Sequence, residues 1–417
     1  MSKLNNTSTR LFGHLMAYGA SEAATKLSRL GVVVVVARSL DLAEVGIAAA
    51  ALATGDLLKS LTENGVTQRI VVASDDDLDA VCHRAHQLNW LWCGGLFALQ
   101  AVLAAALWLG FGKTFLALMI LILGAEYLFM PGGLVQCGLA LRQGKLSRTA
   151  AIAGTQSVSA NVLSMVLAVL WPTPLALVLP RLLTAPIWLV MMRRLAPWRR
   201  RAAAARAPIA SFLRYGGPVL GTEVIRTMRL HADKLLVGAL LGPELLGAYF
   251  MAFNAGLSLA SSFSTAFAAV LFPHLCASED RGGALGQGMR LSLGLITPVV
   301  ILQSLLAPWY VPLLLGPQHN ALAEPVAILC LVAIPSMLWT ATAGWMRATQ
   351  ATLRELRGTL VVTFALLAST LICAPYGLSA LAWGYLATAT LTMLALSTPA
   401  LKHAFPQTFK TEPAQCL

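Results

Sequence analysis

Long apolar runs recur along the whole chain, and several of them reach 18 residues or more. A run of that length is what an α-helix needs to cross the hydrocarbon core of a bilayer. Only 12% of the 417 residues are charged, whereas a soluble domain has about 25%. No stretch is long and polar enough to form a separate soluble domain. The sequence therefore predicts an all-α, polytopic membrane protein.

The apolar runs can be divided into about twelve transmembrane helices of roughly 20 residues or more. The expected spans are residues 11–37, 43–69, 88–111, 114–140, 149–170, 174–192, 211–239, 244–274, 288–313, 322–346, 355–374 and 378–401. An even number of spans returns the chain to the side on which it began. Both termini are therefore expected on the same face of the membrane.

A basic, alanine-rich stretch at residues 193–210 divides the predicted spans into two sets of six. We predict an N-terminal six-helix bundle at 1–192, a cytoplasmic linker at 193–210, and a C-terminal bundle with a short cytoplasmic tail at 211–417. The two halves show faint repetition at an offset of 201 residues, which pairs Gly46 with Gly247. Repeats of six spans run parallel, so the bundles would be pseudo-symmetric around a central cavity.

The basic residues are distributed unevenly between the two sides of the predicted membrane. The net charge is +12, with 30 Lys and Arg, and only Arg38 and Lys113 fall on the side opposite the linker. Positive charge gathers on the cytoplasmic side of membrane proteins, so we expect both termini in the cytoplasm and no nucleic-acid partner. The seven cysteines are scattered without a CxxC, and we expect no disulfide framework, metal site or cofactor.

Three predicted spans carry ionisable side chains at helical spacing, on one face of each helix. These residues are Glu22, Lys26 and Arg29; Asp56, Lys59 and Glu63; and Glu223, Arg226, Arg229 and Asp233. Ionisable groups at bilayer depth are costly, and they usually face a bundle interior or a watery cavity. The clusters in the expected spans 11–37 and 211–239 lie about half a chain apart, which suggests one cavity lined by both halves. This pattern predicts a transporter.

Two interpretations of these charges remain open at this stage. The charges could neutralise one another within a helix, as Asp56 and Lys59 could, and hold the bundle together. Alternatively, they could line a hydrated path for a charged ligand. In that case the basic members would bind phosphate oxygens: Lys26, Arg29, Lys59, Arg226 and Arg229. The acidic members would carry a coupling proton or cation or face the cavity: Glu22, Asp56, Glu63, Glu223 and Asp233.

Two passages resemble the polysaccharide transporters of the multidrug/oligosaccharidyl-lipid/polysaccharide (MOP) exporter superfamily, of the O-antigen flippase type. The first passage is residues 37–46 (ARSLDLAEVG) with 63–69 (ENGVTQR). The second and better match comprises residues 212–218 (FLRYGGP), 233–238 (DKLLVG), 241–249 (LGPELLGAY) and 271–273 (LFP). Together they cover about a quarter of the chain.

This resemblance implies a multi-pass protein of the bacterial inner membrane that exports a polyprenyl-pyrophosphate-linked oligosaccharide by alternating access. In the family the first and seventh spans line the cavity, often with basic residues, which maps onto Lys26, Arg29, Arg226 and Arg229. Asp233 matches a family aspartate. The expected partners are the lipid-linked glycan, membrane lipids, a polysaccharide polymerase and a coupling proton or cation. We expect no enzymatic activity.

Two other functions compete with the flippase hypothesis. A small-molecule antiporter of the multidrug type would favour a cavity dominated by carboxylates, and the intramembrane basic residues weigh against it. A membrane-embedded glycosyltransferase or polymerase would need catalytic carboxylates at an outer loop, where the chain offers little beyond Asp41, Glu44, Glu244 and Glu324. The chain has no GxxxxGK[ST] motif, so it is not expected to be driven directly by ATP.

Overall fold

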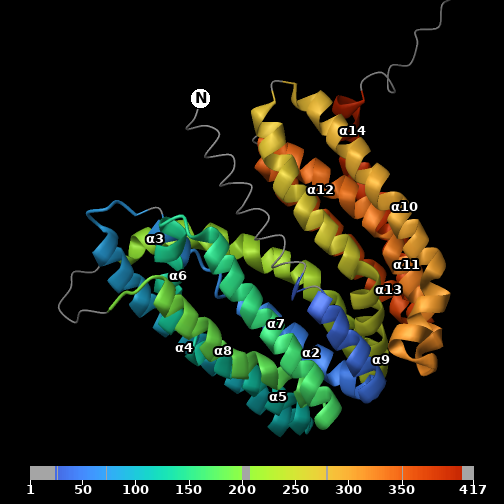
Figure 1. Ribbon diagram of the computed structural model, residues 1–417, viewed down its shortest axis with the longest axis horizontal. Helices are drawn as coiled ribbons and strands as arrows, with labels where there is room; N and C mark the ends of the chain where they lie inside the picture. The colour runs from blue at the N-terminus through green and yellow to red at the C-terminus, as the bar shows by residue number, and fades with distance from the viewer. Residues whose placement is uncertain are drawn as a thin grey trace, which may run out of the picture. The chain divides into compact units, whose positions relative to one another are not determined.

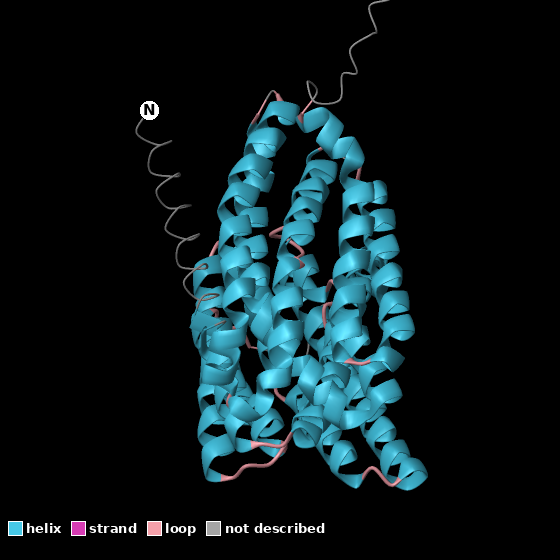
Figure 2. Cartoon of the chain, turned by 90° about the vertical axis from the view of Figure 1, so that its right-hand side faces the viewer, coloured by secondary structure: helices cyan, strands magenta, loops and turns pink. Residues whose placement is uncertain are grey.

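Helices account for every regular element in the part of the chain that the structure describes. The computed structural model describes residues 24–25, 27–71, 73–199, 207–278, 280–349 and 351–405, and only some of the side chains within 209–277. Within these ranges there are α-helices and short 3-10 helices, and no strand (Figures 1 and 2). The predicted all-α class is confirmed.

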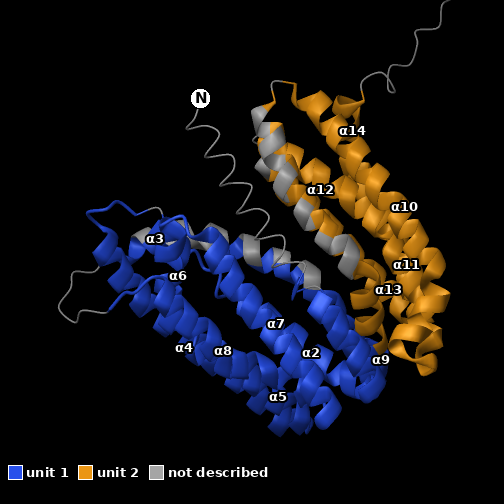
Figure 3. Cartoon of the chain, viewed as in Figure 1, with its two compact units in different colours: residues 1–247 blue, residues 248–417 orange. Residues whose placement is uncertain are grey.

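The chain divides into two compact units, residues 1–247 and 248–417 (Figure 3). Unit 1 contains α2 (Leu42–Ser60), α3 (Val66–Val71), α4 (Leu78–Phe111), α5 (Thr114–Gly124), η1 (Ala125–Leu128), α6 (Pro131–Arg142), α7 (Leu146–Leu170), α8 (Leu175–Leu195) and the first part of α9 (Ile209–Ala277). Unit 2 contains the rest of α9, then α10 (Arg281–Leu315), η2 (Pro317–Leu322), α11 (Ala323–Leu331), α12 (Ala333–Ala348), α13 (Thr352–Cys373), η3 (Ala374–Tyr376) and α14 (Leu378–Ala404). This division falls at a different point from the linker at 193–210, and the six-plus-six arrangement stays a prediction.

Eight helices of the described residues are long and apolar enough to cross a membrane, and a bent pair of helices raises the number to nine. The predicted count of twelve is therefore approximate. Part of the difference lies in broken spans. The expected fourth span bends by 53° between residues 114–128 and 131–142, because Pro131 cannot continue the preceding hydrogen-bond ladder. The expected second span breaks into α2 and α3 around Gly65, whose φ is 78°.

The expected seventh and eighth spans follow one another through a turn at Gly242 within α9. Gly242 has φ 82° and ψ 179°, a conformation that side chains with a Cβ rarely adopt. Pro243 follows it, with a ring that presets the φ angle of a first helical residue. The sequence Leu241–Gly242–Pro243 therefore interrupts the helix at the position where the span pattern predicts a short loop.

The 201-residue offset pairs Gly46 with Gly247 in the sequence. In unit 1, Gly46 lies against the backbone of Pro243, and Gly247 lies against the backbone of Leu42. A Cβ on Gly46 would overlap the carbonyl oxygen of Pro243, and a Cβ on Gly247 would overlap that of Leu42. Backbones can approach this closely only where the side chain is absent, as at small-residue crossings of membrane helices. The two glycines are therefore explained by a crossing between the start of α2 and the segment after Gly242.

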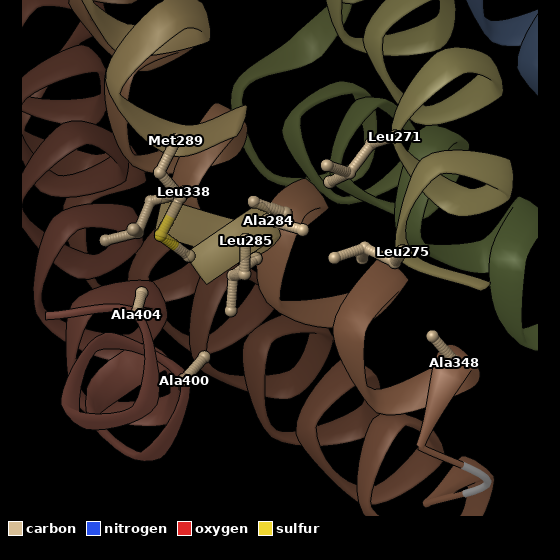
Figure 4. Packing of buried hydrophobic residues seen from close by; sticks show 10 residues of the cluster. Leu271, Leu275, Ala284, Leu285, Met289, Leu338, Ala348, Ala400 and Ala404 are labelled. Atoms are coloured by element: carbon tan, nitrogen blue, oxygen red, sulfur yellow. The ribbon is translucent and has the colours of Figure 1, made fainter. Parts of the chain in front are cut away.

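Unit 2 is held together by apolar packing among α9, α10, α12 and α14. Its largest described cluster contains Leu271, Leu275, Leu285, Met289 and Leu338, with alanines between them (Figure 4). Trp345 and Phe405 pack at the edge of the cluster. Small residues let the helices approach, and the larger side chains fill the remaining space.

Candidate functional site: a charged cluster in unit 1

Ionisable side chains from several helices meet in unit 1. Asp56 and Lys59 stand one turn apart on α2, on the same face of the helix. Their partners come from η1, α8 and α9, which lie far away in the sequence. The predicted charged face of α2 is thus the centre of a cluster that we call the charged cluster: Asp56, Lys59, Glu126, Arg181 and His231.

Asp56 connects three helices. The Arg181 guanidinium on α8 donates hydrogen bonds to both carboxylate oxygens of Asp56. Nη1 donates to Oδ1, and Nη2 donates to Oδ2 at 3.3 Å. The Nδ1 atom of His231, on α9, lies 3.9 Å from Asp56 Oδ2. A two-pronged contact of this kind fixes geometry as well as charge, since the planar guanidinium matches a carboxylate or a phosphate equally well.

Lys59 forms the second ion pair of the charged cluster. Its Nζ atom lies 2.5 Å from Oε1 of Glu126. Glu126 occupies the 3-10 turn η1, where α5 ends and the chain bends towards α6. The Glu126 side chain is 7% exposed, whereas that of Lys59 is 38% exposed. The carboxylate is therefore the buried partner, and the ammonium reaches the edge of the protein.

The charged cluster is accessible rather than sealed. The exposed fractions of the Asp56, Arg181 and His231 side chains are 23%, 30% and 21%. Ion pairs that keep this much exposure retain part of their hydration, so they contribute less than a fully buried pair and can exchange partners at lower cost. The pairing predicted within α2, Asp56 with Lys59, is replaced by pairs between helices, because each charge finds a closer partner across the bundle.

Arg29 lies beside the charged cluster on the helical segment 27–39. It is exposed and within electrostatic range of Asp56 and Arg181. One turn of the same segment is anchored to α7, because Asn161 Nδ2 donates to Ser28 Oγ at 2.8 Å. The structure thus places three of the predicted residues, Arg29, Asp56 and Lys59, in one neighbourhood.

The remaining predicted residues have different outcomes. Glu22 and Lys26 lie outside the described residues, as do the side chains of Glu223, Arg226 and Arg229 on α9. Their assignment to a cavity stays a prediction.

Glu63 was expected on the helical face of span two, and that placement is wrong. Helix α2 ends at Ser60, and Glu63 is an exposed residue of the turn that follows. The turn is set by local chemistry: Asn64 accepts a hydrogen bond from the backbone of Val66 at 3.1 Å, and Gly65 takes a positive φ.

Asp233 and Lys234 are both buried on α9, with exposed fractions of 4% and 6%. Lys234 Nζ lies 3.3 Å from Asp233 Oδ1. Neighbouring residues on a helix normally point apart, so the long lysine side chain bends back to the carboxylate. The two charges offset one another locally, and both lie within electrostatic range of His231.

The predicted site omitted Glu126, Arg181 and His231. The sequence contained a usable signal for each, because an ionisable residue inside an apolar span is a functional candidate by default. What it did not contain was their proximity to Asp56 and Lys59. In the described part of the chain, no three His, Cys, Asp or Glu residues gather where they could hold a metal ion.

A large apolar pocket of about 1030 Å³ lies near the end of α4 in unit 1. Its walls come from α2, α4, α5 and the part of α9 around Gly242, including Leu103, Phe115 and Leu235. Of the described residues that line it, only Lys113 is charged. Such a pocket suits a hydrocarbon chain with an anionic group at its edge.

Comparison with solved structures defines the class of protein. A lipid II flippase MurJ in an inward closed conformation matches with a TM-score of 0.79 and 12% sequence identity, over 94% of this chain and 90% of that one. An inward-facing multidrug resistance MATE transporter of the MOP superfamily matches with a TM-score of 0.66 and 15% identity, over 95% and 96% of the two chains. The chain therefore has the fold of MOP transporters.

The sequence comparison gives the family. Residues 35–324 match the family described as "Polysaccharide biosynthesis protein", and the chain belongs to that family. It is also 25% identical over 148 residues to the amylovoran biosynthesis protein AmsL of Erwinia amylovora. That alignment covers 32% of this chain and spans about a third, 36%, of the relative's length. The resemblance to polysaccharide transporters of the MOP superfamily is confirmed.

Proposed function

We propose that this protein translocates a polyprenyl-pyrophosphate-linked oligosaccharide across the bacterial inner membrane by alternating access, for assembly of a cell-surface polysaccharide. Membership of a polysaccharide biosynthesis family supports a glycan substrate. The fold shared with a lipid II flippase supports a lipid-linked form of that substrate. Both termini are assigned to the cytoplasm on the distribution of basic residues.

The observation that carries this proposal is the accessible charged cluster where α2, η1, α8 and α9 meet in unit 1. Arg181 and Lys59 are bound to carboxylates, yet both remain partly exposed. A pyrophosphate offers the same oxygen geometry as Asp56, with more negative charge. We infer that the substrate phosphate competes with Asp56 for Arg181 and with Glu126 for Lys59.

This exchange suggests how charge could be balanced during transport. When phosphate binds Arg181, the displaced Asp56 needs a new partner, and the neighbouring His231 is close enough to serve when protonated. A coupling proton or cation at Asp56 would act in the same way. Lys26, Arg29, Arg226 and Arg229 would extend the basic surface of the cavity, and the apolar pocket near Lys113 would hold part of the hydrocarbon chain.

The test is glycan export in a deletion strain. Deletion of the gene should leave lipid-linked oligosaccharide on the inner leaflet, and the wild-type gene should restore display of the glycan. We expect Lys26→Ala and Arg226→Ala each to reduce export about tenfold or more, since each removes a charged contact to phosphate, without loss of membrane insertion. Arg354→Ala, at an exposed position of α13, is the matched control and should export normally.

Full glycan display with both Lys26 and Arg226 replaced would contradict the proposal. Susceptibility of the same strains to cationic drugs tests the multidrug alternative, which predicts a change in drug efflux and no accumulation of lipid-linked oligosaccharide. Polymerisation by a partner polysaccharide polymerase should also stop in the deletion strain, because that enzyme would use the exported lipid-linked oligosaccharide as its substrate.

A further inference from the structure

A second, smaller pocket of about 440 Å³ lies elsewhere in unit 1 and shares no residue with the charged cluster. It is formed where the first turns of α4 and α6 meet the end of α8 and the residues after it. The lining residues are His86, Gly132, Gln136, Arg193, Pro197, Trp198 and Arg199. The large apolar pocket lies about 30 Å away along α4, at 1.5 Å per residue.

The pocket is shaped by glycine and by a stack of aromatic rings. A Cβ on Gly132 would lie 2.8 Å from Arg193 Nη2, so the glycine leaves room for the guanidinium against α6. Arg193 Nε donates to the Gly132 carbonyl oxygen at 3.0 Å. The centroid of the Trp198 ring lies 5.1 Å from the centroid of the His83 ring and 5.4 Å from that of the His86 ring. These contacts fix the walls of the pocket.

Neighbouring contacts hold the same region in place. Trp198 packs against a buried cluster that includes Ile70, Val81 and Ala207. Arg84 Nε donates to the carbonyl oxygen of Ala207 at 2.7 Å. The backbone N–H of Ala207 donates to the carbonyl oxygen of Ala80 at 3.1 Å. The segment after α8 and the segment before α9 are therefore both attached to the first turns of α4.

The polar groups of the pocket point to an anionic ligand. Arg193 and Arg199 supply positive charge, and no carboxylate is found among the described residues that line it. Gln136 also lines the pocket and is 5% exposed. Its side-chain amide can donate two hydrogen bonds, which suits a ligand with several acceptor oxygens.

We propose that this pocket binds a phosphate group, either on a lipid headgroup or as a free anion. The guanidinium groups of Arg193 and Arg199 match phosphate oxygens, and Gln136 donates to a third oxygen. The volume is sufficient for a phosphate with its ester substituent. The basic segment 193–199 is expected at the cytoplasmic face, where anionic headgroups concentrate. This site does not depend on the proposed transport function.

The experiment measures binding by the purified full-length chain after delipidation. Dioleoyl phosphatidic acid is titrated and adducts are counted by native mass spectrometry. We expect Arg199→Gln and Gln136→Leu each to weaken the tightest adduct about tenfold. Arg199 is exposed, so its replacement should not impair folding. Arg357→Gln, an exposed arginine of α13, removes the same charge elsewhere and should bind as the wild type does.

A second arm distinguishes the two sources of phosphate. If inorganic pyrophosphate displaces phosphatidic acid from the wild type, a free phosphate is sufficient. If the lipid binds and pyrophosphate does not displace it, the ligand is a lipid headgroup. Both outcomes support the site. Equal binding by the wild type, Arg199→Gln and Gln136→Leu would overturn it, as would an equal loss in Arg357→Gln.

Discussion

The two compact units place their charges differently. In unit 1, Asp56 pairs with Arg181 and Lys59 pairs with Glu126, in both cases across the bundle. In the described part of unit 2, the ion pair between Arg347 and Glu355 lies at the turn between α12 and α13. Unit 1 therefore has a cluster of ion pairs that joins α2, η1 and α8, whereas the described ion pair of unit 2 lies at a turn between consecutive helices.

Neutral hydrogen bonds also connect the helices of unit 2. Thr342 on α12 donates to Ser397 on α14 at 2.8 Å, and Ser304 on α10 donates to the carbonyl oxygen of Ala327 on α11 at 2.8 Å. Such hydrogen bonds join helices at modest cost in a bilayer. The apolar cluster around Leu285 and Met289 supplies the remaining packing.

This contrast teaches that two helical units of one chain need not share the same chemistry. Packing requires only small and apolar residues, which both units have. Among the described residues, the cluster of ion pairs lies in unit 1, where a function can account for the cost of its charges. The comparison can be tested by removing single contacts from each unit and measuring the free energy of unfolding.

The largest effect is expected at the pair between Asp56 and Arg181. Arg181→Leu leaves a poorly solvated carboxylate without its partner and should lower the free energy of unfolding by about 3 kcal/mol. The double variant Asp56→Asn/Arg181→Leu should lose less than the single variants Asp56→Asn and Arg181→Leu summed, since neither charge is then left without its partner. Equilibrium unfolding in mixed micelles measures both. Strict additivity of the two changes would show that the residues do not interact.

An intermediate and asymmetric effect is expected at the pair between Lys59 and Glu126. Lys59→Met leaves the buried Glu126 carboxylate without its partner and should lower the free energy of unfolding by about 2 kcal/mol. Glu126→Gln leaves a lysine that can reach water and should lower it by about 1 kcal/mol. The same unfolding measurement ranks them. A larger loss for Glu126→Gln would mean that Lys59 is the more buried partner.

The smallest effect is expected in unit 2, at the hydrogen bond between Thr342 and Ser397. Ser397→Ala should cost about 1 kcal/mol, and Thr342→Val/Ser397→Ala should be nearly neutral because no polar group is left unpaired. Thr398→Ala, at the exposed neighbouring position, is the control. If Ser397→Ala cost as much as Arg181→Leu, the two units would not differ in the way described.

Local sequence patterns correctly predicted much of this molecule. The long apolar runs predicted helices, and the spacing of Asp56 and Lys59 predicted a shared face. The same method failed at Glu63, because the helical spacing was continued past a turn that Asn64 and Gly65 form. In that case short-range turn chemistry overrode periodicity.

The sequence by itself determined that the chain spans a membrane with helices and keeps ionised groups inside them, since hydrocarbon leaves the backbone few alternatives. Only the tertiary structure decided which charges meet. Arg181 is 125 residues from Asp56, and Glu126 is 67 residues from Lys59. Periodicity relates residues on one helix, whereas these pairs depend on how separate helices pack, and that packing is a property of the whole bundle.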